Sequence, residues 1–130
     1  MPRKFTSINQ KKGKIGEKIA EKYLINKGFR IIETNYTISI GEIDIIAIKN
    51  NIIHFIEVKS VTREISLFNS SINLYNPAEN FHRKKLERVY KTANTYCITN
   101  NVHDQWRIDL LCVYIDHKVK KAKVDMISVY

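Results

Sequence analysis

The chain has 130 residues, a length that fits one compact domain with its own hydrophobic core, so we expect a single domain over residues 1–130. Hydrophobic residues make up 44% of the chain, and no apolar run approaches the ~20 residues of a membrane span. The basic N-terminus lacks the apolar stretch of a secretory signal, which favours the cytoplasm. Cys97 and Cys112 are far apart and the histidines are scattered, so we expect free thiols and no zinc site.

Positive charge dominates the composition. The chain has 22 Lys+Arg against 13 Asp+Glu, a formal net charge of +9 and a pI near 9.6. This balance favours a polyanionic partner, with nucleic acid ahead of an acidic membrane. Abundant Ile, Lys and Asn are also typical of an AT-rich genome, which raises lysine content without a functional cause. Charge alone therefore leaves a merely solvated basic surface open.

A first helix is expected over residues 8–27, after a loose basic arm at residues 1–7. Ile15 and Ile19 begin an apolar series at helical spacing. Gly28 follows the last periodic residue and predicts the C-terminal cap of this helix.

Three strands are expected next, and the last two should form a tight hairpin. The three segments are residues 29–36, 41–49 and 52–60. Asn50 and Asn51 tolerate left-handed backbone, which the favoured two-residue hairpin turns require.

The second half of the chain predicts a loop, a helix and two more strands. Residues 61–76 have no clear period and should form a long loop. A second helix should cover about residues 77–99, with Asn76 as its N-cap. The last two strands are residues 106–115 and 123–129, joined by a turn at His117-Lys118. The order αβββαββ predicts a mixed α/β fold of packed layers.

The predicted hairpin brings charged residues of two strands together. If the turn centres on the two asparagines, the numbers of opposed residues sum to a constant, so Asp44 should face Glu57 and Glu42 should face Lys59. Two carboxylates about 4 Å apart repel each other by about 4 kcal/mol at an effective dielectric of about 20. A divalent cation between them reverses the sign of this energy, and oxygen-only ligands suit Mg²⁺ or Mn²⁺.

Lys59 should lie on the same face as Glu57. There it can hold a water nucleophile or neutralise charge that develops on a phosphate. The alternative is an ordinary cross-strand ion pair between Glu42 and Lys59, with Asp44 at a solvated end of the sheet. Perturbed carboxylate pairs in clefts are usually functional, so the geometry favours a metal site.

Glu17 is a further candidate because of the glycines beside it. Gly13 and Gly16 each cost a helix interior about 1 kcal/mol relative to alanine. Glycines three residues apart form a smooth stripe that permits close approach, and Glu17 would enter that gap beside the metal. By itself, a frayed helix start with an ordinary surface glutamate is the simpler explanation.

The second predicted helix is rich in cations. Lys85, Arg88 and Lys91 recur every three residues and drift slowly around one side of the helix. With Arg83, they predict a surface that contacts phosphates, although a solvated run of charges is an open alternative.

Four stretches of the chain are specific when their order and spacing are taken together. They are Gly13-Lys-Ile-Gly-Glu-Lys-Ile-Ala20, Gly41-Glu-Ile-Asp-Ile-Ile-Ala47, Phe55-Ile-Glu-Val-Lys59 and Arg107-Ile-Asp109. Through them nearly the whole chain resembles the YraN-like family of small, largely uncharacterised bacterial proteins. That family looks like the PD-(D/E)XK nuclease superfamily and is similar in core to archaeal Holliday junction resolvases.

The resemblance implies a restriction-endonuclease-like three-layer core, in which helices flank a mixed β-sheet in the order αβββαβ. It implies Asp44 and Glu57 as ligands of Mg²⁺ or Mn²⁺. Lys59 would be the catalytic lysine, and Glu17 the helix carboxylate that completes the site. Lys85 matches a lysine common in the second helix of the family. Related resolvases act as dimers, which leaves a homodimer open here.

The chain departs from the family pattern at several positions. Thr37 and Val61 stand where the family often has arginines, and residues 64–76 lack the usual glycine. Asp109 matches a strand aspartate for which the sequence offers no physical role.

Three functions therefore remain in competition. They are an Mg²⁺-dependent endonuclease acting on DNA, with branched or structured DNA as one candidate substrate, a non-catalytic nucleic-acid-binding protein with a nuclease-like fold, and a protein-interaction subunit.

Overall fold

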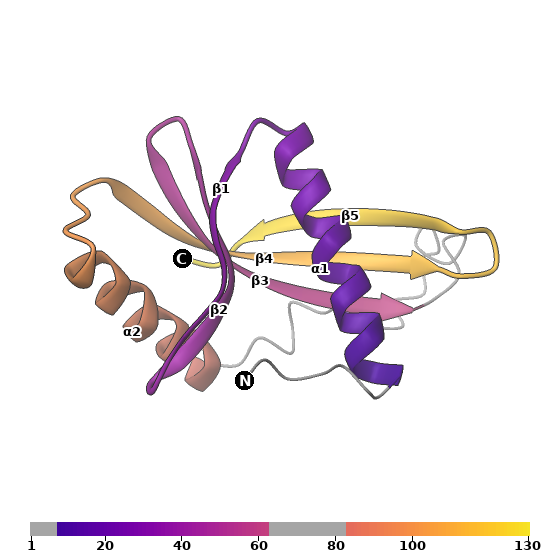
Figure 1. Cartoon of the computed structure of the whole chain (residues 1–130), viewed down its shortest axis with the longest axis horizontal. Helices are drawn as coiled ribbons and strands as arrows, with labels where there is room; N and C mark the ends of the chain where they lie inside the picture. Colours follow the sequence, from indigo (N-terminus) through magenta and orange to yellow (C-terminus); the bar gives the residue numbers. More distant parts are fainter. Residues whose placement is uncertain (1–7, 63–82) are drawn as a thin grey trace.

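The computed structural model describes residues 8–62 and 83–130 (Figure 1). The predicted basic arm, the loop beyond Thr62 and the predicted start of the second helix at Pro77 lie outside these residues. Within them the elements follow the predicted order αβββαββ. They are α1 (Ile8–Asn26), β1 (Arg30–Ile38), β2 (Gly41–Lys49), β3 (Ile52–Thr62), α2 (Arg83–Thr99), β4 (Gln105–Asp116) and β5 (Lys121–Ser128).

The described strands form one mixed sheet in the order β1-β2-β3-β4-β5. Neighbouring strands are antiparallel, except that β3 and β4 are parallel. A parallel pair needs a crossover connection, and α2 lies within that connection. In Figure 1, β1 and β2 run upright while β3, β4 and β5 run across, so the sheet is strongly twisted.

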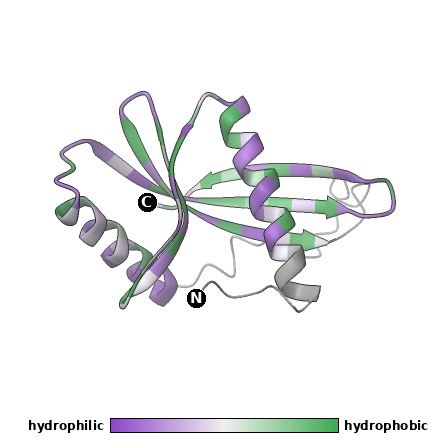
Figure 2. Ribbon diagram, viewed as in Figure 1, coloured by the Kyte–Doolittle hydropathy of each residue, from purple (hydrophilic) through white to green (hydrophobic). Residues whose placement is uncertain are grey.

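The two helices cover opposite faces of the sheet. Ala20 and Leu24 of α1 pack in one buried cluster with Ile45, Ile56 and the middle of β4. A second cluster joins the inner side of α2 to the other face of the sheet. Its described members are Ile43, Ile46, Ile53, Phe55, Val89, Ala93, Tyr96, Cys97 and Ile108. Figure 2 shows the middle of β4 as hydrophobic, while purple and green alternate along the helices.

This arrangement confirms the mixed α/β class. The helix–sheet–helix layers are compatible with a three-layer, nuclease-like core. Within the part of the chain that the structure describes, neither helix is long and apolar enough to cross a membrane. Cys97 and Cys112 are both buried free thiols, as expected.

The predicted cap and hairpin turn are both confirmed. Gly28 has φ +92°, and it ends α1 with two backbone hydrogen bonds. Its own N–H donates to the Ile25 carbonyl at 3.0 Å, and the Phe29 N–H donates to the Leu24 carbonyl at 2.9 Å. Asn50 and Asn51 have φ of 52° and 62°, the left-handed pair that a two-residue hairpin needs.

Strand lengths differ from the prediction where pairing overrides local pattern. Residues 61 and 62 were expected in a loop, but β3 continues to Thr62 because it pairs there with Ile115 of β4. In the same way, β5 begins at Lys121 because this residue pairs with Asp116. Non-local hydrogen bonds of this kind leave no trace in the local sequence.

Candidate active site

β2 and β3 separate near the middle of β3. Their ladder runs from Lys49↔Ile52 to Ile45↔Ile56, where it ends. Beyond Ile56, β3 remains paired with β4 as far as Thr62, whereas β2 stays paired with β1. The two strands therefore form a fork, and one edge of β3 is without a strand neighbour among the described residues.

Asp44 and Glu57 lie at the mouth of this fork rather than in the ladder. The predicted register is correct as far as Ile45↔Ile56, but the ladder ends there, one pair before Asp44 and Glu57, so these two residues are not paired through the backbone. The reason lies in the pattern of burial: Ile43 and Ile46 both pack on the α2 side of the sheet, while Ile45 packs on the α1 side. Side chains of a regular strand alternate between the two faces of the sheet, and this alternation is broken between Ile43 and Ile46. Asp44 lies within the irregular part, and its side chain lines the same cavity as Glu17 of α1.

A hydrogen bond closes the fork at Asp44. The Val58 N–H on the open edge of β3 donates to Asp44 Oδ2 at 2.8 Å. A side-chain carboxylate thus takes the place of the backbone carbonyl that a continued β2 would offer. This bond fixes the carboxylate beside Glu57.

The proposed site residues meet in one cavity of about 390 Å³. Glu17 enters it from α1, Asp44 from β2, and Glu57 and Lys59 from β3. The cavity is also lined by Gly13, Val58, Ser60, Thr62 and Ile115. Consecutive residues of β3 line it although their side chains alternate in direction, because the cavity lies along the open edge of that strand.

Burial and crowding perturb the acids in this cavity. Burial is the main cause that raises the pKa of Asp44 to about 7, and the Glu57 carboxylate is the next. The Val58 hydrogen bond acts in the opposite direction. Burial also raises the pKa of Glu17, against the nearby Lys14 ammonium. Such displaced carboxylates are typical of functional clefts.

Gly16 brings α1 close enough to deliver Glu17. A Cβ atom on Gly16 would lie 1.7 Å from Ser60 Oγ and 3.0 Å from Ser60 Cβ, so α1 rests on β3 at this point. Gly13 has open space around its Cβ position instead. The predicted glycine stripe is thus confirmed for close packing at Gly16, while Gly13 lines the cavity.

Lys85 connects this cavity to α2. Its Nζ lies 2.9 Å from Glu57 Oε1, and the Glu57 side chain is only 13% exposed. The alternative of an ion pair between Glu42 and Lys59 is not found among the described residues, where Glu57 pairs with Lys85. The sequence could not show this contact, because it joins a residue of α2 to a residue of β3.

The predicted basic surface forms a second cavity of about 770 Å³, which we call the basic groove. It is lined by Arg83, Lys84, Lys85 and Arg88. Arg83 is highly exposed and lies 3.5 Å from Glu87 on the next turn. Lys85 belongs to the groove and also contacts Glu57, so the groove adjoins the acidic cavity.

The acidic cavity fits some divalent metals better than others. Within the described residues, no three His, Cys, Asp or Glu side chains converge closely enough to hold an ion by themselves. A closed cage of the kind that structural zinc uses needs more converging ligands than these residues provide. Mg²⁺ usually takes one or two carboxylates and completes its shell with water and substrate phosphates. Asp44 and Glu57 match that requirement.

One buried polar pair was not foreseen. His54 Nδ1 lies 2.5 Å from Asp109 Oδ2, and the two residues are 9% and 3% exposed. Phe29 covers the imidazole edge-on, with ring centroids 4.9 Å apart. The sequence offers no physical role for Asp109, and His54 stands among apolar residues of β3. The contact gives each of them a partner in the core.

The fold and cavity define a class: a mixed α/β protein of three layers with an acidic cavity where two strands of its sheet diverge. The model of the Uncharacterised protein family UPF0102 matches residues 16–113. The chain belongs to this family, which confirms the YraN-like resemblance.

Similar proteins occur in several bacteria. A UPF0102 protein of Campylobacter jejuni is 39% identical over 104 residues, which cover 80% of this chain and 84% of the relative. One from Clostridioides difficile is 40% identical over 111 residues, which cover 85% and 90%. One from Alkaliphilus oremlandii is 37% identical over 119 residues, which cover 91% and 95%.

Proposed function

We propose that the protein is a Mg²⁺-dependent endonuclease that hydrolyses phosphodiester bonds in DNA. The observation that carries the proposal is the meeting of Glu17, Asp44 and Glu57 with Lys59 in one cavity at the fork of the sheet. Mn²⁺ is the natural substitute ion, because it accepts the same oxygen ligands.

The proposal gives each residue a distinct role. Asp44 and Glu57 would hold the metal, which would polarise a phosphate oxygen and lower the pKa of a water molecule. Lys59 would orient the attacking water or balance charge that develops on the phosphate. Burial raises the pKa of Glu17, which makes its carboxylate a stronger proton acceptor than an exposed glutamate.

The basic groove supplies the means to hold the substrate. Arg83, Lys85 and Arg88 would contact backbone phosphates on the side of α2 next to Glu57. Because Lys85 is paired with Glu57, a metal at Glu57 would release the lysine for a phosphate. The groove and the acidic cavity would then act on the same strand of DNA.

The decisive experiment compares cleavage of branched, single-stranded and duplex DNA by the wild type and by Asp44→Ala, with Mg²⁺ and with Mn²⁺. We expect Asp44→Ala to lose cleavage, while Asp125→Ala retains it, because Asp125 is an exposed carboxylate on β5. If the wild type and Asp44→Ala behave alike on every substrate, the proposal fails.

A second function has support of its own. The Lys85–Glu57 ion pair already neutralises one acid of the cavity, and Thr37 and Val61 replace arginines that the family often has. These features favour a nucleic-acid-binding protein without catalysis. Such a protein would bind DNA equally well in the presence and absence of a chelator, with an affinity that depends on salt.

A further inference from the structure

Three aromatic side chains from distant parts of the chain meet beside the exposed side of α2. The ring centroid of Tyr90 lies 5.4 Å from that of Trp106 and 5.1 Å from that of Tyr130. The rings of Trp106 and Tyr130 are 5.6 Å apart and inclined by 34°. Tyr90 and Tyr130 are 37% and 59% exposed, so this cluster, which we call the aromatic shelf, reaches the surface.

Contacts with the core and with β4 fix two of the three residues of the shelf. Trp106 packs edge-on against the buried Phe55, with ring centroids 5.4 Å apart. The Ile108 N–H donates to the Tyr130 carbonyl at 3.0 Å, which fixes the backbone of Tyr130 against β4. The rings are therefore oriented before any ligand arrives, and a ligand would lose little free energy in ordering them.

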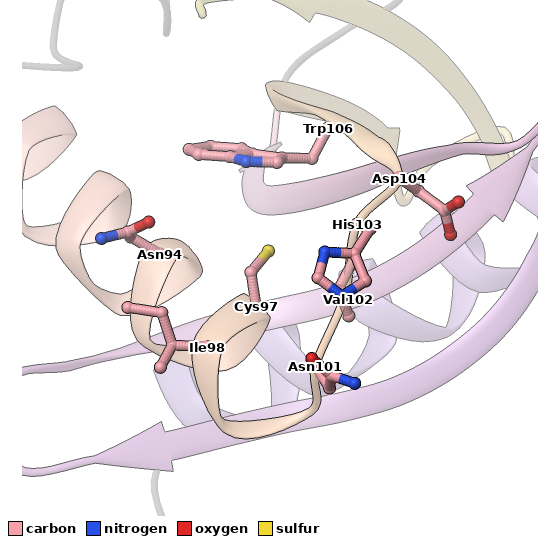
Figure 3. A pocket seen from close by; sticks show the side chains of 8 residues that line it. All are labelled: Asn94, Cys97, Ile98, Asn101, Val102, His103, Asp104 and Trp106. Carbon is pink, nitrogen blue, oxygen red and sulfur yellow. The ribbon is translucent and has the colours of Figure 1, made fainter.

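Two hollows adjoin the shelf. One, of about 320 Å³, is lined by Arg83, Leu86, Glu87, Tyr90, Lys91 and Tyr130. The other, of about 440 Å³, has Trp106 as one wall (Figure 3). Figure 3 shows Asn94, Asn101 and His103 around it, side chains that can donate and accept hydrogen bonds.

Cations of α2 flank the same surface. Arg83, Tyr90 and Asn94 recur at helical spacing and so lie along one stripe of the helix. Arg83 lines both the first hollow and the basic groove, which continues to Lys85 and Glu57. A single surface therefore leads from the acidic cavity to the aromatic rings.

We infer that the aromatic shelf binds unpaired bases of a single-stranded nucleic-acid segment. Aromatic rings stack on bases of any sequence, and neighbouring cations contact the backbone between them. Fully paired DNA keeps its bases stacked inside the duplex and offers no ring to the shelf. A second copy of this chain is a poorer occupant, because it carries the same cations beside the shelf and the same net charge of +9.

The inference rests on the proposed function, because it specifies which DNA the endonuclease would hold, namely DNA with an unpaired segment beside the cleaved bond. It can be tested without cleavage. Trp106 is the only tryptophan of the chain, so intrinsic tryptophan fluorescence reports on the shelf alone. A chelator present throughout prevents metal-dependent hydrolysis.

The experiment titrates the full chain with a short oligothymidylate and with a duplex of matched length. We expect the oligothymidylate to quench Trp106 and the duplex to leave its fluorescence unchanged. Replacement of both shelf tyrosines in Tyr90→Leu/Tyr130→Leu should weaken binding of the oligothymidylate by roughly tenfold or more. Binding of the duplex should not change.

Two controls separate stacking from other effects. Tyr90→Phe keeps the ring and should bind the oligothymidylate much more tightly than the double variant. Ile25→Ala removes an exposed apolar side chain from α1, where it is 58% exposed, and should also bind normally. Circular dichroism confirms that each variant is folded.

Three results would overturn the inference. They are wild-type affinity of the folded double variant for the oligothymidylate, equal quenching by the duplex, and a change in self-association in place of a change in oligothymidylate binding. If the wild type fails to cleave DNA but the shelf variants lose oligothymidylate binding, the endonuclease proposal fails and the shelf remains.

Discussion

Asp44 lies in surroundings that would favour its ionised carboxylate only when a cation is bound to it. Its hydrogen bond with the Val58 N–H favours the ionised form, but burial and the Glu57 carboxylate oppose ionisation more strongly and raise the pKa to about 7. Ionised Asp44 is therefore unfavourable in the metal-free protein. A divalent cation would remove this penalty, and protons would compete with the metal for the same oxygens.

The pKa of Asp44 gives a prediction for stability against pH. The folded protein binds more protons than the unfolded chain between pH 3.8 and about 7, so the contribution of Asp44 to stability falls as the pH rises through this window. Asp44→Asn keeps an acceptor for the Val58 N–H and removes the charge. We expect it to stabilise the protein by roughly 1–3 kcal/mol at pH 8 and to have little effect near pH 4.

Urea unfolding at the two pH values measures this difference. Asp125→Asn, on an exposed position of β5, should show no comparable dependence on pH. An Asp44→Asn variant that is destabilised at pH 8, or changed equally at both values, would contradict the physical account of Asp44.

Lys85 provides a second prediction. Its ammonium must leave Glu57 before a metal can use both carboxylate oxygens, so Lys85→Met should raise the affinity for Mg²⁺ while it lowers the affinity for DNA. The Lys85 side chain is 39% exposed but that of Glu57 only 13%, so loss of the ion pair should lower stability by roughly 1–3 kcal/mol. Calorimetric titration with Mg²⁺ tests this, with Lys84→Met as the control. Unchanged or weaker Mg²⁺ binding by Lys85→Met would contradict the idea that Lys85 and Mg²⁺ compete for the Glu57 carboxylate.

At the level of elements, the seating of α1 on β3 can be tested with two glycines of one helix. Alanine is favoured over glycine by about 1 kcal/mol within a helix, so Gly13→Ala should be neutral or stabilising. Gly16→Ala should instead destabilise the protein by roughly 1–3 kcal/mol, because its Cβ would overlap Ser60. Thermal unfolding measures both.

A compensating change sharpens this test. Ser60→Gly removes the atoms that the new Cβ of Gly16→Ala would meet, so the double variant should regain part of the lost stability. If Gly16→Ala is as stable as Gly13→Ala, then α1 does not depend on the close approach at Ser60, and the placement of Glu17 needs another explanation.

The sequence predicted elements well where the signals are local. Gly28 ended α1, and Asn50 and Asn51 made the hairpin turn, because each adopts a backbone conformation that few other residues tolerate. The position of this turn also predicted the register of β2 and β3 correctly, for example at Ile46↔Phe55. The turn does not determine where the ladder between the two strands ends, because the end depends on how β2 follows β1.

The sequence predicted which residues form the candidate site, but it did not predict the side-chain contacts that join the site to other elements. The sequence predicts Asp44, Glu57, Lys59 and Glu17 as members of the site, and all four line one cavity. The Lys85–Glu57 and His54–Asp109 contacts were not foreseen, since each joins residues separated by more than a strand in sequence. Periodicity describes faces of single elements and gives no information on such pairs.

At the scale of the whole molecule, charge should govern binding of DNA. Among the described residues four cations line the basic groove, and if each contacts one phosphate of a single strand, log affinity should fall by about 3 per tenfold increase in salt. Arg83→Gln/Arg88→Gln should reduce that slope by about 1.4. Lys22→Gln/Lys121→Gln removes equal charge elsewhere and should leave the slope nearly unchanged. Equal reductions in both variants would show that net charge, rather than the groove, binds DNA.

The most direct test of the metal site is a crystal of the protein soaked with Mn²⁺ at pH 8, where most Asp44 carboxyls are ionised. The account predicts an anomalous difference peak between the carboxylates of Asp44 and Glu57, with Lys85 moved away from Glu57. Crystals of Asp44→Asn, soaked in the same way, are the control and should show no Mn²⁺ peak at this position. Wild-type crystals that show no Mn²⁺ at this position, with Lys85 still paired to Glu57, would contradict it.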